Sequence, residues 1–206
     1  MFVKNYKKGI IVIIETERLI IRPPRSGDAK PVNQAINQSL NEISRWMPWA
    51  SDPSLETTED FIKRGIQSWK EPQPKELPMI IELKSTGEII SASGFNEKSN
   101  FEVLMFETGY WINTEFAGNG FITEAITAIT RLAFDHFSAV RVQICAQKEN
   151  IKSINVAKRA GFIEEAILKN FRVDCLSKNP CDEVIYACFE KKMLPNLDVF
   201  RIIKQG

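Results

Sequence analysis

The stretch EFAGNGFITEAITAI, residues 115–129, places a Gly-Asn-Gly loop directly before an amphipathic helical pattern. Gly118 and Gly120 carry no Cβ atom, so a ligand can approach the backbone closely at both positions. The first turn of a helix also exposes unpaired N–H donors and a partial positive charge. The loop therefore suits an anion such as a phosphate, although by itself it is equally consistent with a tight turn that only begins the helix.

Two common nucleotide-binding motifs do not fit this loop. A P-loop needs Gly-Lys-Ser/Thr, whereas this chain has Gly120-Phe121-Ile122. A dinucleotide-binding fingerprint needs three glycines after the first strand of a βαβ unit. This loop has two glycines, and a series of strand-like runs precedes it. The sequence on either side of the loop must therefore decide between the remaining folds.

Strand-like runs lie on both sides of the loop. Three of them precede it, and the polar turns between them suit hairpins. The third, residues 101–112, is apolar on both faces and is therefore predicted to be one central strand. The expected strands cover residues 18–23, 77–84, 88–96, 101–112, 139–146 and 183–192.

Helical patterns alternate with these runs. The helix after the loop has an apolar stripe with a period of 3.6 residues. Thr57 and Asp60 have the spacing of a capping box at the start of another helix. Asn150 is placed to cap a third helix, which Gly161 is placed to end. The expected helices cover residues 28–40, 56–70, the stretch that follows Gly120, and 151–160.

These elements predict an α+β fold with a mixed, mostly antiparallel sheet of six to seven strands, flanked by about four helices. A single domain is expected over residues 15–194. Residues 1–14 are interpreted as an N-terminal extension or an extra strand, and residues 195–206 as a C-terminal tail outside the pattern.

The composition narrows the possible partners and chemistry. Lys and Arg number 27 and Asp and Glu 26, so no strong net charge favours nucleic acid or a membrane surface. Four scattered cysteines without a C-x-x-C pair indicate reduced thiols and a cytoplasmic protein. His136 is the single histidine, so neither a Ser-His-Asp triad nor a multi-histidine zinc site is expected, and we expect no metal.

Two motifs about thirty residues apart carry a resemblance to a known family. GYWINTEFAGNGFITEA (109–125) followed by ENIKSINVAKRAGF (149–162) resembles the Gcn5-related N-acetyltransferases. RWMPW (45–49) resembles the ribosomal-protein alanine/serine N-terminal acetyltransferases, the RimJ/RimL-like group. The resemblance covers residues 15–192 in order and spacing. It implies acetyl-CoA as cosubstrate and central strands that splay apart.

The same resemblance assigns the cosubstrate site. Backbone groups of Ile112 and Thr114 would pair with the pantetheine arm, and N–H groups of the glycine loop would bind the pyrophosphate. The chain departs from the family at Ala117, usually Arg or Gln, and at Ile122, usually Ala or Gly. The residues expected to bind acetyl-CoA are Ile112, Thr114, Ala117, Gly118, Asn119, Gly120, Phe121, Ile122, Thr123, Asn150 and Ser153.

Catalysis requires a base, a proton donor and a wall for the acceptor. Glu107 is the first candidate for the base, with a simple ion pair to a neighbouring Lys or Arg as an equal alternative. Glu115 is the second candidate, with an ordinary loop carboxylate as the alternative. The family often has a tyrosine at the position of Ala157, so Ser153 is the candidate donor instead, or an ordinary helix serine. Trp46, Trp49 and Trp111 are the candidates for the acceptor wall, with burial in the core as the alternative.

The expected function is acetyl-CoA-dependent acetylation of a primary amine. Deprotonating an α-amino group at pH 7 costs only about 1 kcal/mol, against about 4–5 kcal/mol for a lysine, so a weak base favours the α-amino group of a protein N-terminus. A small amine or antibiotic is the alternative acceptor. A CoA-binding module without catalysis is the alternative outside the enzymes. Either a monomer or a homodimer is expected.

Overall fold

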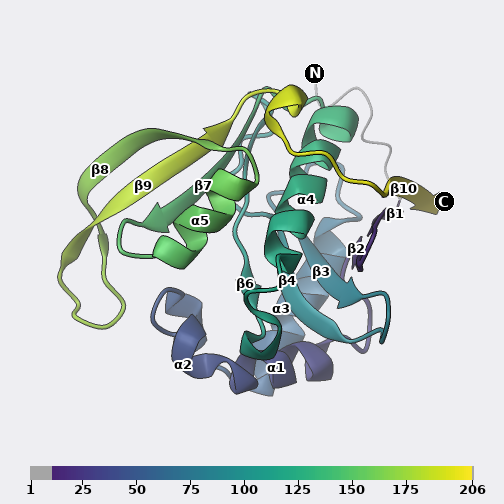
Figure 1. Cartoon of the computed structure of the whole chain (residues 1–206). Coiled ribbons are helices and arrows are strands. Elements are labelled where there is room, and N and C mark those ends of the chain that lie inside the picture. The colour runs from purple at the N-terminus through teal and green to yellow at the C-terminus, as the bar shows by residue number, and fades with distance from the viewer. Residues whose placement is uncertain (1–10, 206) are drawn as a thin grey trace.

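The strands form two β-sheets, which the computed structural model describes over residues 11–205 (Figure 1). Every pairing between strands is antiparallel except that of β5 with β7. The larger sheet contains, in spatial order, β10 (Phe200–Gln205), β1 (Ile11–Thr16), β2 (Leu19–Arg22), β3 (Leu77–Leu83), β4 (Ile89–Phe95) and β6 (Trp111–Ile112). The smaller contains β5 (Met105–Glu107), β7 (Arg141–Gln147), β9 (Pro180–Cys188) and β8 (Ile163–Val173). The predicted α+β class with a mostly antiparallel sheet is confirmed.

The run of residues 101–112, predicted to be one central strand, is divided between the two sheets. Residues 101–104 form a turn, in which Leu104 has a φ of 61°. β5 pairs with β7, whereas β6 pairs with β4, so the chain changes sheet at residues 108–110. The prediction was wrong because the two halves are apolar for different reasons. Phe106 belongs to the main core, and Trp111 packs against a second, smaller cluster.

The helices lie close to the predicted positions, but one cap differs. Ser54 rather than Thr57 is the N-cap of α3, since the Ser54 Oγ accepts a hydrogen bond from the Thr57 N–H at 3.2 Å. The predicted capping box at Thr57 and Asp60 is therefore wrong, because the helix begins one turn earlier. The helices are α1 (Ala29–Gln38), α2 (Leu40–Ile43), α3 (Leu55–Ser68), α4 (Phe121–Phe137) and α5 (Ile151–Arg159), with short 3-10 turns η1 (Pro48–Ser51), η2 (Thr114–Phe116) and η3 (Lys191–Met193).

Helices cover both faces of the larger sheet. Side chains alternate along β3, so that Met79 and Ile81 join the main core while Ile80 joins the smaller cluster with α1 and α3. α4, which crosses the sheet in Figure 1, supplies the main core with a fully buried stripe. That stripe contains Ala125, Ile126, Ile129, Leu132 and Ala133. The apolar period of α4 therefore fixes the first turn of this helix, and with it the glycine loop, against the sheet.

The two ends of the described chain lie side by side. β10 pairs with β1 along its whole length, with Ile11 opposite Gln205 and Thr16 opposite Phe200. The sequence pattern did not predict a strand within residues 195–206, whereas the alternative of an extra strand near the N-terminus agrees with β1 from residue 11 onward. The rest of the predicted extension, residues 1–10, lies outside the described residues. Among residues 11–205, no helix is long and apolar enough to cross a membrane.

Candidate active site

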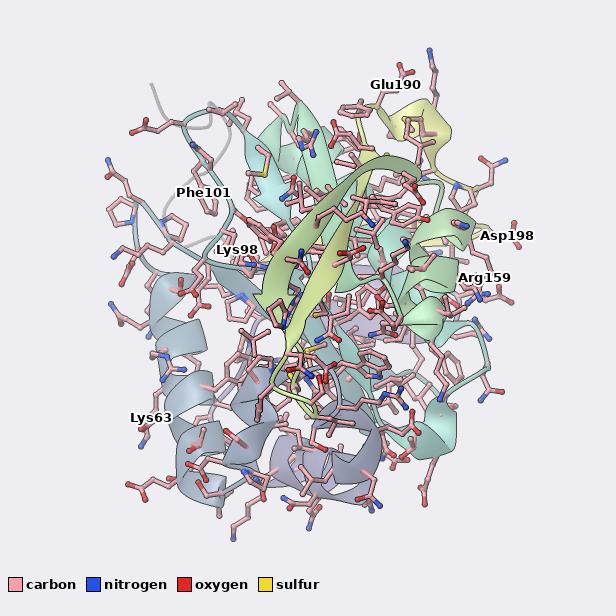
Figure 2. All side chains as sticks on the ribbon, turned by 90° about the vertical axis from the view of Figure 1, so that its left-hand side faces the viewer. Lys63, Lys98, Phe101, Arg159, Glu190 and Asp198 are labelled. Carbon is pink, nitrogen blue, oxygen red and sulfur yellow. The ribbon has the colours of Figure 1, made fainter. Side chains whose placement is uncertain are left out.

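The two sheets part between β6 and the second half of β7, and we call this opening the splay. β7 pairs with β5 over residues 141–143, and β6 pairs with β4 on its other side. A cleft of about 610 Å³ reaches this region, with walls from α1, η1, α3, β4, β7 and the first turn of α5. Figure 2 shows α3 with Lys63 and α5 with Arg159 on opposite sides of the β8–β9 hairpin, and Lys98 lines the cleft. Six residues predicted for the site line the cleft: Trp46, Trp49, Glu107, Trp111, Asn150 and Ser153.

Glu107 is a buried carboxylate surrounded by donors. Its Oε1 accepts a hydrogen bond from Asn96 Nδ2 at 3.0 Å and lies 3.7 Å from Lys98 Nζ. Its Oε2 accepts from Gln143 Nε2 at 2.7 Å and from Cys145 Sγ at 3.3 Å. Burial, reinforced by the charge of Glu107, raises the pKa of the Cys145 thiol well above its ordinary value, so the thiol stays a donor. The surroundings of Glu107 are therefore compatible both with the predicted role as a base and with the alternative ion pair to a lysine.

Ser153 pairs with Tyr110, a residue that the sequence analysis did not single out. The Tyr110 Oη lies 3.0 Å from the Ser153 Oγ and donates to the Ser153 carbonyl at 3.0 Å. Burial raises the pKa of the Tyr110 phenol well above its ordinary value, so the hydroxyl stays protonated. Although Ala157 lacks the phenol usual in the resembling family, a different tyrosine brings one to the same helix. The Gly-Tyr-Trp run before the loop was the signal that could have identified it.

Asn150 and Gly161 bound α5 as predicted. The Asn150 Oδ1 accepts a hydrogen bond from the Ser153 N–H at 3.1 Å, which makes it the N-cap. Gly161 has a φ of 86°, and a Cβ there would collide with the Met193 carbonyl. The Phe162 N–H donates to the Ala157 carbonyl at 3.0 Å, as expected for a Schellman-type stop. Ser153 is therefore held one turn into a helix whose two ends are both fixed.

The three candidate tryptophans lie on the cleft and outside the fully buried core. Trp49 is 43% exposed, and Trp46 and Trp111 are half-buried. Trp69 is the contrasting case, because it is buried and its Nε1 donates to the Pro78 carbonyl at 2.7 Å. Trp46, Trp49 and Trp111 thus present aromatic surface to the cleft.

The backbone of β6 has one free edge at the splay, because β6 is the last strand of its sheet. The Asn113 N–H donates to the Ile90 carbonyl on β4, so the backbone groups of Ile112 point the opposite way, toward the splay. Thr114, also predicted to pair with the cosubstrate, is already engaged. Its N–H donates to the Ser39 Oγ at 2.8 Å, and its carbonyl accepts from the Ala117 N–H at 3.2 Å. Of the two predicted backbone contacts, Ile112 alone remains available.

The glycine loop holds its N–H groups free for a ligand. Gly118 and Gly120 have φ values of 83° and 80°, in the left-handed region that favours glycine. The backbone N–H groups of residues 118–123 donate to no other group within the described part of the chain. The Asn119 Nδ2 braces the loop by donating to the Phe116 and Ala117 carbonyls. The loop and the first turn of α4 therefore offer a cluster of unpaired donors at the positive end of a long helix.

Arg18 brings a positive charge to this loop from the β1–β2 turn, which the sequence did not predict. Its guanidinium donates to Glu124 at 2.7 Å and to the Asn119 carbonyl at 2.9 Å, and it lies 4.5 Å from the Phe121 ring centroid. Glu124 also accepts from the Thr16 hydroxyl at 2.7 Å. Glu124 thus joins the first turn of α4 to the β1–β2 turn. Arg18 therefore places a positive charge beside the glycine loop, where the side chain of Ala117 provides none.

Glu115, the second candidate base, is not brought to the cleft. It lies exposed in η2 and is absent from the cleft lining. The Asn113 Oδ1 caps this turn by accepting from the Glu115 N–H at 3.2 Å. The cap fixes the backbone and leaves the carboxylate on the surface.

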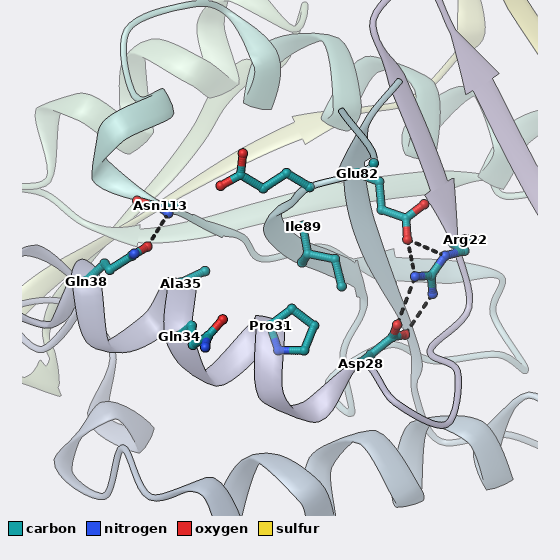
Figure 3. Close-up of a pocket in the computed structure, with 11 residues that line it drawn as sticks. Arg22, Asp28, Pro31, Gln34, Ala35, Gln38, Glu82, Ile89 and Asn113 are labelled. Atoms are coloured by element: carbon teal, nitrogen blue, oxygen red, sulfur yellow. Dashed lines mark hydrogen bonds and ion pairs between the residues drawn. The ribbon is translucent and has the colours of Figure 1, made fainter. Parts of the chain in front are cut away.

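A second cavity of about 320 Å³ lies beside α1 and has Asn113 in its lining (Figure 3). Arg22 is buried there between Asp28, at 2.7 Å, and Glu82. Burial alone would lower the pKa of Arg22, but hydrogen bonds with both carboxylates raise it overall. Gln38 accepts a hydrogen bond from the Asn113 Nδ2 at 2.8 Å. These polar groups are paired with one another, which is typical of a structural network.

A helix N-terminus with free loop donors, the open edge of β6 and a cleft that reaches the splay make up a site that suits an enzyme with an anionic cosubstrate. The family model for the acetyltransferase (GNAT) domain matches residues 18–163. The chain therefore belongs to the GNAT acetyltransferase family, and the protein is an acyltransferase of the N-acetyltransferase class.

Two named relatives and one solved structure are similar to this chain. YdaF of Bacillus subtilis strain 168, whose name proposes a ribosomal N-acetyltransferase, is 30% identical over 151 residues, which are 72% of this chain and 80% of YdaF. The ribosomal-protein-serine acetyltransferase of Escherichia coli K12 is 23% identical over 154 residues, 75% of this chain and 84% of that protein. The solved structure of RimL, a ribosomal L7/L12 α-N-protein acetyltransferase in complex with coenzyme A, has a TM-score of 0.79 at 19% identity and covers 87% of this chain and 98% of RimL. The last comparison supports the fold.

Proposed function

We propose that this protein transfers the acetyl group of acetyl-CoA to the α-amino group of a peptide or protein N-terminus. The observation that carries the proposal is the position of Glu107 and the Tyr110–Ser153 pair on one cleft, beside the free backbone edge of Ile112. Acetyl-CoA would enter from the side of the glycine loop. The acceptor amine would enter from the side of the cleft.

The cosubstrate would be held by backbone rather than by charged side chains. The N–H groups of residues 118–122 and the dipole of α4 suit the pyrophosphate, and Ile112 suits an amide of the pantetheine arm. Arg18 would add a charge that partly replaces the arginine or glutamine usual at Ala117. The Asn150 Oδ1 is used by the cap, so its Nδ2 is the group that would reach the pantetheine.

The chemistry needs one proton removed from the amine and a leaving thiolate that is stabilised by hydrogen bonds. The neutral amine nitrogen attacks the thioester carbonyl, a C–N bond forms, and the C–S bond breaks to release the CoA thiolate. Glu107 would take the amine proton, directly or through a water molecule, while the Ser153 hydroxyl, held by Tyr110, would donate a hydrogen bond to the leaving sulfur. The backbone N–H of Ile112 would stabilise the oxyanion.

The charges of the cleft favour a singly charged acceptor over a polycation. Its lining contains four carboxylates, Asp52, Glu76, Glu97 and Glu107, and three cations, Arg64, Lys98 and Arg172, for a formal charge of −1. A polyamine or aminoglycoside would find little excess of carboxylates here. The names of YdaF and of the Escherichia coli protein agree with a protein acceptor, and such an acceptor would place the enzyme in the cytoplasm.

Thermal unfolding with acetyl-CoA tests the cosubstrate. Acetyl-CoA at about 100 times its Kd should raise Tm by about 5–10 °C, with NAD and ATP as controls that leave Tm unchanged. CoA release should then follow addition of peptides that begin with Ala or Ser, and not of the same peptides with an acetylated N-terminus. Release with small amines alone would assign the alternative acceptor. A Tm rise without release by any amine would assign a binding module.

A further inference from the structure

Gln147, the last residue of β7, has an unpaired carboxamide at the edge of the cleft. The residue is 2% exposed, and it belongs to the cleft lining. Neither its Oε1 nor its Nε2 makes a hydrogen bond to another group of the described residues. Buried amides are normally satisfied because an unpaired buried donor or acceptor is costly, so the partner of this amide must come from outside the described residues, as a water molecule or a ligand in the cleft.

The alternation of β7 places this side chain on the acceptor side of the sheet. Val142, Ile144 and Ala146 point into the main core. Gln143 and Cys145 point to the opposite face, where both contact Glu107. Gln147 shares their face, because side chains two residues apart lie on the same side of a strand.

The neighbours of Gln147 leave its amide unoccupied. Glu183, directly opposite in the β7–β9 register, is paired with Arg172 at 2.8 Å. The backbone carbonyl of Gln147 accepts from the Asn150 N–H at 2.9 Å, which holds the end of the strand against the start of α5. The side chain is therefore fixed at the base and unpaired at the tip.

We propose that Gln147 binds the first peptide bond of the acceptor, so that the enzyme selects peptide N-termini over simple amines. A carboxamide offers one donor and one acceptor, and a peptide group offers the matching acceptor and donor. The step from Cys145 to Gln147 spans about 6.6 Å along the strand. When the α-amino nitrogen of the acceptor lies near Glu107, the Cα and carbonyl carbon of its first residue, together with one hydrogen bond, can cover that span. This inference rests on the proposed function, whose acceptor it specifies.

The substitution Gln147→Leu separates this role from a structural one. Removal of an unsatisfied buried amide should leave Tm unchanged or raise it, while KM for an N-terminal peptide rises about tenfold and kcat changes less. Gln143→Leu is the matched stability control. The Gln143 carboxamide is fully used by Arg141 and Glu107, so this variant should lower Tm. Gln147→Met serves as the second variant if leucine prevents folding.

The decisive experiment pairs the variant with an altered substrate. CoA release is measured with the tripeptide Ser-Ala-Ala and with its analogue in which an ester oxygen replaces the first peptide N–H. The wild type should lose about tenfold in kcat/KM with the ester, and Gln147→Leu should lose nothing further. Equal losses in both proteins, or an unchanged KM for the peptide in Gln147→Leu, would overturn the role of Gln147 alone. Failure of the wild type to acetylate any peptide, despite a Tm rise with acetyl-CoA, would overturn the peptide acceptor as well.

Discussion

The hydrogen bonds that hold the Glu107 carboxylate also limit its use as a base. A carboxylate has about four lone-pair sites, and Asn96, Gln143 and Cys145 donate hydrogen bonds to three of them. The Lys98 ammonium, at 3.7 Å, lies beside the fourth site, where an incoming proton would have to bind. Lys98 is the weakest of the four, because it is 3.7 Å away on a largely exposed side chain. A base role therefore requires that the acceptor amine, or a water, displaces the lysine.

The substitution Glu107→Gln tests this requirement. We expect kcat/KM for a peptide amine to fall by about 10²–10³, because the amine loses its base, while the Tm rise with acetyl-CoA persists. Steady-state CoA release and thermal unfolding are the two measurements. Lys98→Ala is the companion variant, and it should keep or increase activity. A loss of Tm in Glu107→Gln with unchanged turnover would instead assign the carboxylate to the ion pair alone.

The hydroxyl pair at the splay gives a second prediction. Tyr110→Phe should lower kcat about tenfold or more without weakening the binding of acetyl-CoA, because in the proposed mechanism the phenol holds the Ser153 hydroxyl for the leaving sulfur. Since burial raises the pKa of Tyr110, kcat should show no decline from its ionisation between pH 7 and 10. Ser153→Ala should cost a similar factor, and the double variant little more than either single one. Independent, multiplicative losses would show that the two hydroxyls do not act together.

At the residue level, local patterns predicted local interactions. The Asn150 cap involves a residue only three positions away, and the role of the loop glycines depends only on their own positive φ values. The contacts of Tyr110 and of Arg18 could not be predicted, because their partners lie 43 and 106 positions away in the chain. Gln147 was missed for a related reason. An unpaired amide is defined by what surrounds it in space.

At the scale of elements, the glycine loop and α4 act as one unit. Gly118→Ala adds a Cβ at a φ of 83° with no atom within 4 Å, and Gly27→Ala does the same at 104° in the turn before α1. Both should lower the free energy of unfolding by about 1 kcal/mol through the left-handed backbone. Gly118→Ala alone should also raise the Kd for acetyl-CoA, by about tenfold or more, measured by calorimetry. Equal Kd values in the two variants would show that the loop does not bind the pyrophosphate.

The elements themselves were largely predictable, and the main error has a physical cause. The stripe of α4 and the stops of α5 follow from spacing and from single residues. The division of residues 101–112 does not, because Phe106 and the half-buried Trp111 pack against different neighbours in the two sheets. The hydrophobic pattern of the sequence indicates that a side chain is buried, but it does not indicate which sheet buries it. The splay, which is central to the candidate site, was therefore inferred from resemblance alone.

For the whole molecule, alkaline pH should weaken the fold through buried thiols. Burial raises the pKa of the fully buried Cys188 thiol to about 11, against an ordinary value of 9.0. Below about pH 9 both folded and unfolded chains keep this proton, so its contribution to stability is complete. Between pH 9 and 11 the unfolded chain releases the proton first, and the free energy of unfolding should fall by about 2–3 kcal/mol.

Urea unfolding at pH 8, 9, 10 and 11 measures this loss. Cys188→Ala should start from a lower stability and show a shallower decline, because the buried thiol is gone. Cys145, whose pKa is raised in the same direction, leaves part of the decline in place. Parallel declines in wild type and Cys188→Ala would contradict the assignment.

The pairing of β1 with β10 has a consequence for synthesis of the chain. The partners Thr16 and Phe200 are separated by 184 positions, and Ile11 and Gln205 by 194. At a translation rate of about 5–20 residues per second, β1 waits roughly 10–40 s for its outer neighbour. During that interval the nascent chain presents a bare row of backbone donors and acceptors to whatever is nearby. The ribosome surface and its attendant chaperones are thus the first environment in which this sheet must avoid a wrong partner.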